Sequence, residues 1–132
     1  YSFNQYEEYD GATGEIRGVV ATTGTPYGAV IDCDGILYGA TLAATIDVID
    51  TTTRTYVRSQ NAGNPTYGIT LDSDGIVWIA GWTSQQLLRY DPTSGEIDHY
   101  NTPNGESELA RLSSQSEGAG LAVNGGVSRS PE

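Results

Sequence analysis

Two acidic tetrapeptides have the residue types and spacing that could bind a cation. Asp32-Cys33-Asp34-Gly35 and Asp72-Ser73-Asp74-Gly75 each place two carboxylates two residues apart, just before a glycine. Carboxylate oxygens are the ligands that Ca²⁺ prefers, but a loop of the EF-hand type also needs a Glu at its twelfth position. Ala43 and Thr83 stand there instead. Because Asp-Gly also favours a tight turn between apolar strands, we expect structural turns. The alternative is weak calcium binding by Asp32, Asp34, Asp72 and Asp74.

A second candidate site lies in the segment from Gly81 to Gln86. It holds one aromatic residue, Trp82, and two neighbouring amides, Gln85 and Gln86. Aromatic rings next to polar groups suit the binding of sugars or peptides. We therefore predict that Trp82, Gln85 and Gln86 contribute to a ligand-binding surface.

Other catalytic chemistry finds little support in the residues. There is no Gly-x-Ser-x-Gly motif, no phosphate-binding loop and no cluster of Cys and His for zinc. Cys33 is the only cysteine, so it forms no internal disulfide, and we expect an inert thiol exposed in its turn. His99 is the only histidine. We predict no catalytic residue and no cofactor other than the calcium considered above.

The elements that must position these residues come from an internal repeat. Residues 27–38 (YGAVIDCDGILY) recur as residues 67–78 (YGITLDSDGIVW), 40 positions later and without a gap. A second motif, around Tyr-Asp or Ile-Asp, begins at residues 9, 49 and 90, with spacings of 40 and 41. Two independent motifs with one period indicate a repeat architecture.

Each period reads as four short strands joined by Gly-containing turns. In the second copy we expect strands over 68–72, 76–80, 87–90 and 96–100, since these runs are rich in β-branched and aromatic residues. The best helical pattern is over 106–115. A unit of four strands and about 40 residues has the size of one β-propeller blade. The sequence therefore predicts an all-β fold built from four-stranded antiparallel blades.

The repeat also predicts how the chain divides into blades. We expect residues 1–26 to form the last two strands of one blade, residues 27–66 and 67–103 to form two full blades, and residues 104–132 to hold an insertion. That last segment also holds a weak copy of the first two strands of a further blade. This is about three blades, cut out of phase, whereas closed propellers have about four to eight. We therefore expect the chain to be completed by further blades of a longer protein or by identical copies.

The blades resemble the streptogramin (virginiamycin B) lyase-like and NHL-type family of β-propeller repeats. The family joins a Tyr-Gly-Ile strand, Asp-x-Asp-Gly and an Ile-Val-Trp strand to a hairpin around Asp-Pro-x-Ser/Thr-Gly-Glu-Ile. Residues 67–78 and 87–97 carry this pattern, with a weaker copy in 27–56. The lyases of this family place catalytic His residues and metal-binding acids on several blades near the central tunnel. We expect His99 in the outermost strand of a blade, so the resemblance implies the fold and supplies no catalytic residue.

Composition narrows the class of partner. The chain has six Arg, no Lys and seventeen acidic residues, for a net charge of −11. This balance disfavours binding to nucleic acid, and no apolar stretch is long enough to insert into a membrane. The lack of Lys and Met favours a processed extracellular or cell-surface protein. We expect a non-enzymatic module that recognises a partner or builds an assembly. The alternatives are a streptogramin-lyase-like C–O lyase that needs further blades and a calcium-stabilised structural domain.

Overall fold

The computed structural model describes residues 4–102, 119–122 and 126–129, and these residues form antiparallel strands and no helix. The described part therefore contains no helix that could cross a membrane. The strands are β1 (Gln5–Tyr9), β2 (Ile16–Ala21), β3 (Pro26–Ile31), β4 (Ile36–Thr41), β5 (Thr45–Asp50), β6 (Thr55–Asn61), β7 (Thr66–Leu71), β8 (Val77–Gly81), β9 (Gln86–Tyr90), β10 (Ile97–Asn101), β11 (Ala119–Ala122) and β12 (Gly126–Arg129).

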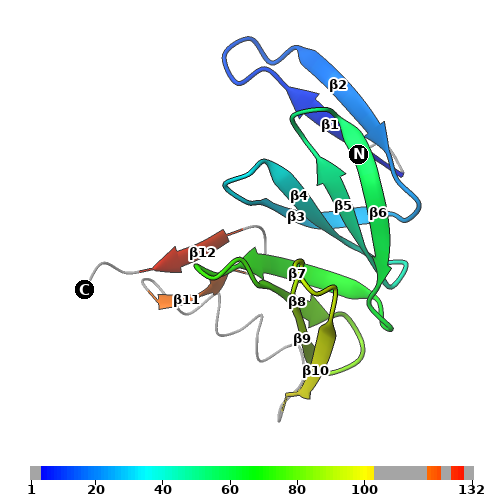
Figure 1. Cartoon of the computed structure of the whole chain (residues 1–132), viewed down its shortest axis with the longest axis vertical. Coiled ribbons are helices and arrows are strands. Elements are labelled where there is room, and N and C mark those ends of the chain that lie inside the picture. The colour runs from blue at the N-terminus through cyan, green and yellow to red at the C-terminus, as the bar shows by residue number, and fades with distance from the viewer. Residues whose placement is uncertain (1–3, 103–118, 123–125, 130–132) are drawn as a thin grey trace.

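The strands form four separate sheets in chain order (Figure 1). Two sheets have four strands, β3-β4-β5-β6 and β7-β8-β9-β10, and two have two strands, β1-β2 and β11-β12. Within each sheet, strands that follow one another in the chain pair in antiparallel fashion. The four-stranded antiparallel blades predicted from the repeat are confirmed. The described strands do not close into a ring.

The strands of the second blade differ from the predicted ranges by one or two residues. The first strand was expected over 68–72, whereas β7 runs from Thr66 to Leu71. Asp72 lies outside it because its carboxylate shapes the turn that follows. Oδ1 of Asp72 accepts hydrogen bonds from the backbone N–H of Asp74 and of Ile76, at 2.9 and 3.0 Å. The predicted helix over 106–115 lies outside the described residues.

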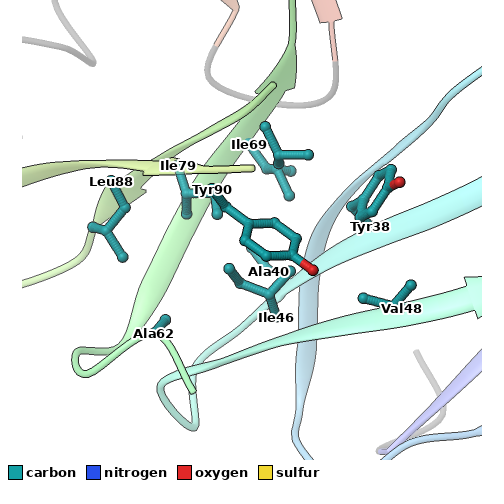
Figure 2. Close-up of a cluster of buried hydrophobic side chains, with 10 residues drawn as sticks. Tyr38, Ala40, Ile46, Val48, Ala62, Ile69, Ile79, Leu88 and Tyr90 are labelled. Carbon is teal, nitrogen blue, oxygen red and sulfur yellow. The ribbon is translucent and has the colours of Figure 1, made fainter. Parts of the chain in front are cut away.

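The core lies between the two four-stranded blades. Alternate residues of β4 and β5 face alternate residues of β8 and β9, as a period-2 pattern requires. Ile46, Ile79 and Leu88 are fully buried there, and the rings of Tyr38 and Tyr90 meet edge to face at 6.2 Å (Figure 2). The core consists of Tyr38, Ala40, Ile46, Val48, Ala62, Ile69, Val77, Ile79, Leu88 and Tyr90.

Neighbouring sheets pack against each other in chain order. β7 lies against β3 and β4, and β11 and β12 lie on the other side of β7 (Figure 1). On the far side of the first four-stranded blade, the Tyr6 hydroxyl of β1 sits directly over Gly39 of β4, where a Cβ would collide with it. The guanidinium group of Arg54, in the β5–β6 turn, donates to the carboxylate of Glu8 in β1, with N–O distances of 2.6 and 3.2 Å. This ion pair also joins the two sheets.

Tyr38 and Trp78 occupy equivalent positions of the repeat, which predicts that both are core residues between blades. Tyr38 is buried in the core, but Trp78 is only half-buried. The reason is that Trp78 points away from the preceding blade, opposite to its neighbours Val77 and Ile79 in β8. Its ring contacts Tyr100 at 6.3 Å, and its Nε1 donates to Asp72 at 2.7 Å.

Candidate functional site

The topology gives each blade two chemically different ends. In a run of antiparallel hairpins, the first and third turns share one end, and the second turn and the connection to the next blade share the other. We call the first the acidic end, since its turns hold Asp10, Glu15, Asp32, Asp34, Asp50, Asp72, Asp74, Asp91 and Glu96, together with Arg54. We call the second the neutral end, formed by residues 22–26, 41–45, 61–66, 81–86 and 101–102.

Carboxylates of the acidic end organise their own turns. Asp10, Asp50 and Asp91 each accept hydrogen bonds from the backbone N–H groups two and three residues later, at 2.7–3.3 Å. These bonds lower the pKa of all three carboxyl groups below the ordinary value. Burial raises the pKa of Asp72, but the hydrogen bonds from Trp78 and from the backbone outweigh it and lower the pKa overall.

The same hydrogen bonds occupy the carboxylates that the sequence offered as calcium ligands. Oδ1 of Asp32 accepts from the N–H of Asp34 and of Ile36, and its Oδ2 accepts from the Tyr38 hydroxyl at 3.1 Å. Asp34 and Asp74 are exposed. Within the described ranges, no three His, Cys, Asp or Glu side chains gather in a way that could hold a metal ion. Calcium binding stays a prediction, which melting experiments can test.

At the neutral end, three aromatic rings from two blades form one cluster. Tyr27 and Tyr67, at the starts of β3 and β7, stack with ring centroids 4.1 Å apart, and their hydroxyls are hydrogen-bonded. Trp82 meets Tyr67 edge to face at 5.1 Å and Tyr27 at 6.3 Å. Tyr27 is 36% exposed and Trp82 39%. Sequence reasoning selected Trp82 but missed both tyrosines, although their spacing of 40 residues places them on neighbouring strands.

Loops of both blades hold this cluster in place. The N–H of Trp82 donates to the carbonyl of Pro65 at 2.9 Å, which fixes the 81–86 loop against the connection between blades. Thr66 is buried and ties the blades together: its Oγ1 accepts from the N–H of Thr41 and donates to the carbonyl of Thr41, both at 2.8 Å. The rings therefore project from a rigid base.

The neutral end also carries several amide side chains. Oε1 of Gln86 accepts from Asn64 Nδ2 at 3.0 Å and lies 3.2 Å from His99 Nδ1, while its Nε2 donates to Asn101 at 3.1 Å. Gln85 is exposed, and its backbone carbonyl accepts from the N–H and the hydroxyl of Thr102. The three residues predicted from the sequence thus share one loop but have different contacts.

A buried polar cluster lies elsewhere, between β1 and the first four-stranded blade. Asp47 has no exposed surface, and burial raises the pKa of its carboxyl group. Its Oδ1 accepts from the Tyr56 hydroxyl at 2.8 Å. Its Oδ2 and the Tyr6 hydroxyl are both buried without a hydrogen-bond partner in the described part. Burial, followed by the nearby Asp47 charge, also raises the pKa of Tyr6.

Comparison with solved structures decides the fold. Virginiamycin B lyase from Staphylococcus aureus superimposes with a TM-score of 0.66 at 22% identity, over 79% of this chain and 36% of the lyase. A streptogramin B lyase gives 0.63 at 21%, over 76% of this chain and 34% of that one. The fold is that of a streptogramin lyase-like β-propeller. Hydrazine synthase from Kuenenia stuttgartiensis gives 0.69 at 19%, over 76% of this chain and 30% of that one. The sequence matches no protein-family model and no curated protein.

The chain spans only about a third of the length of these three proteins, and it resembles them in fold. Its one histidine, His99, lies in β10, the outermost strand of its blade, where it pairs with Leu88 of β9 and faces Gln86. Cys33 is exposed in the β3–β4 turn. Neither residue lies in the aromatic cluster.

Proposed function

We propose that this propeller is a non-enzymatic, extracellular recognition module that binds its partner at the neutral end. One observation carries the proposal: Tyr27, Tyr67 and Trp82 come from three segments of two blades and meet as partly exposed rings at that end. Large rings held on a rigid scaffold supply contact area at a low entropic cost.

Two further features support this reading. The rings and amides stand on the loops at one end of a rigid blade pair, and loops on a rigid scaffold are where proteins most often bind ligands. The acidic, Lys-free composition suits a protein outside the cell. A lyase activity like that named for two of the structural neighbours would need catalytic groups from blades beyond this chain. In the described part, His99 is the one histidine, and it lies in the outermost strand β10.

A second role, assembly, is favoured by a separate surface. The two-stranded sheet leaves one edge of β1 without a partner strand among the described strands, and Tyr9, Ile16 and Val19 are each at least half exposed. A free strand edge next to apolar side chains is a site where another chain can pair. We propose that further blades, from a longer protein or from identical copies, cover this surface.

The recognition proposal is tested by binding to surface-bound panels of oligosaccharides and of random peptides. The wild-type chain is compared with Trp82→Ala and with a control, Val57→Ala. Val57 is a 50% exposed apolar residue of β6, outside the segments that form the neutral end and the β1–β2 sheet. We expect Trp82→Ala to lose the ligands that the wild type retains and Val57→Ala to keep them. Equal binding by all three proteins would remove the neutral end as the recognition surface.

A further inference from the structure

The distribution of charge over the molecule identifies the kind of ligand that the neutral end suits. The chain carries a net charge of −11, yet no Asp, Glu, Lys or Arg occurs in residues 22–26, 41–45, 61–66, 81–86 or 101–102. The acids of the blade turns all stand at the opposite end. A surface without charge, on a strongly acidic protein, offers no ion pair to an anion and no carboxylate to a cation.

Hydrogen-bonding groups replace the missing charges. Asn64, Gln86 and Asn101 form a continuous chain of amide contacts at 3.0 and 3.1 Å, with His99 Nδ1 3.2 Å from Gln86 Oε1. Thr83 and Gln85, in the 81–86 loop, are exposed. Each amide offers both donors and an acceptor, which suits a ligand whose own groups both donate and accept. Hydroxyl groups have this dual character.

The rings supply the other half of the recognition chemistry. Trp82 and Tyr27 are 39% and 36% exposed. The stacked Tyr27–Tyr67 pair contacts the indole ring edge to face. An exposed indole in the same 81–86 segment as two amides presents a flat apolar surface in a region that also holds polar groups. A ligand that matches this pattern has an apolar face and a polar rim, as the ring of a neutral sugar does.

We propose that the neutral end binds an uncharged saccharide, which stacks on Trp82 and hydrogen-bonds to the amides around Gln86. The inference rests on the proposed recognition function and specifies its ligand class. A peptide is the less favoured occupant, because the contacts on offer are side-chain amides rather than a free strand edge, which a peptide would extend. An acidic saccharide is disfavoured by the net charge of the protein and by the lack of Lys and Arg in the segments that form this end.

The test uses the complete chain and an array that holds neutral, carboxylated and sulfated oligosaccharides of matched length, with proline-rich and random peptides as a second set. We expect binding to neutral oligosaccharides, weaker binding to their charged counterparts, and little change on adding salt. Trp82→Ala should weaken binding about tenfold, since ring stacking and buried area contribute on the order of 1.4 kcal/mol. Trp82→Phe should retain part of the affinity, and Val57→Ala, an exposed change in β6, should leave it unchanged.

The outcomes separate this inference from the function on which it rests. If peptides bind and Trp82→Ala abolishes that binding while no saccharide binds, the saccharide assignment is overturned and recognition at the neutral end stands. If sulfated or carboxylated sugars bind more tightly than neutral ones, the assignment is likewise overturned. If Trp82→Ala binds every ligand as the wild type does, both proposals fail. As a control, circular dichroism of each variant should give the spectrum of the wild type if its blades remain folded.

Discussion

At the scale of single residues, Asp47 is the most unusual feature of the described part. The carboxyl group has no exposed surface and only one of its oxygens has a hydrogen-bond partner, the hydroxyl of Tyr56. The unpaired Tyr6 hydroxyl lies over Gly39, which is the register partner of Asp47 in the sheet. A buried group left unpaired costs stability, and an ionised carboxyl group costs more than a neutral one.

We predict that Asp47→Asn stabilises the protein at neutral pH. In this variant the amide oxygen still accepts the hydrogen bond from the Tyr56 hydroxyl. The NH₂ group supplies a donor on the side of Tyr6, and the buried negative charge is removed. The free energy of unfolding in urea should rise by about 1 kcal/mol. Asp98→Asn, an exposed change next to Arg89, should stay within about 0.5 kcal/mol of the wild type. A clear loss of stability in Asp47→Asn would contradict the idea that the buried charge is unfavourable.

The same residue predicts a pH dependence. Because the pKa of Asp47 is raised in the folded state, the folded protein holds this proton at pH values where the unfolded chain has released it. The resulting stabilisation is present below the unfolded pKa of 3.8 and is lost as the pH rises through the folded pKa. The difference in unfolding free energy between Asp47→Asn and the wild type should therefore grow with pH across that window and then level off. A constant difference would show that Asp47 titrates normally.

At the scale of elements, the β7–β8 turn shows why two similar acids have different roles. Asp72 accepts from the N–H groups of Asp74 and Ile76 and from the Trp78 indole, whereas Asp74 is exposed. We predict that Asp72→Ala lowers the free energy of unfolding by about 2–3 kcal/mol, because it leaves three donors without their acceptor. Asp74→Ala, the matched control, should change it by less than about 0.5 kcal/mol. Equal losses in urea titrations would contradict this assignment.

The Asp74→Ala variant also tests whether the protein binds calcium. A calcium site would use Asp34 and Asp74 as well as Asp32 and Asp72, and binding to the folded state alone would raise the melting temperature. Since hydrogen bonds already occupy Asp32 and Asp72, we expect millimolar calcium chloride and EDTA to give the same melting curve. A calcium-dependent rise that disappears in Asp74→Ala would instead establish the metal site.

These elements also show how far sequence reasoning extends. The blades were predictable because strand patterns and Asp-Gly turns are local and the repeat shows them twice. The aromatic cluster was not, because Tyr27, Tyr67 and Trp82 meet only through the packing of one blade on the next. Trp78 illustrates the same limit. Its repeat position matched that of the buried Tyr38, but the burial of each ring depends on what lies against its face of the sheet.

At the scale of the whole molecule, the two ends of the blades divide two tasks. The acidic turns are stabilised by their own backbone hydrogen bonds and carry most of the net negative charge. The neutral end carries the partly exposed rings. We assign assembly to a third surface, the β1–β2 sheet with its exposed Tyr9, Ile16 and Val19. Recognition and assembly therefore use different surfaces, and variants should separate them.

The last prediction concerns assembly. Val19 of β2 and Val57 of β6 are each 50% exposed, which makes them a matched pair on different sheets. If identical copies complete the blade that holds the free edge of β1, the wild type should sediment as an oligomer at low micromolar concentration. Val19→Glu should shift it toward monomer because a carboxylate would be buried in the contact, whereas Val57→Glu should not. A wild-type chain that sediments as a folded monomer would rule out assembly from copies and leave further blades of a longer protein to cover this surface.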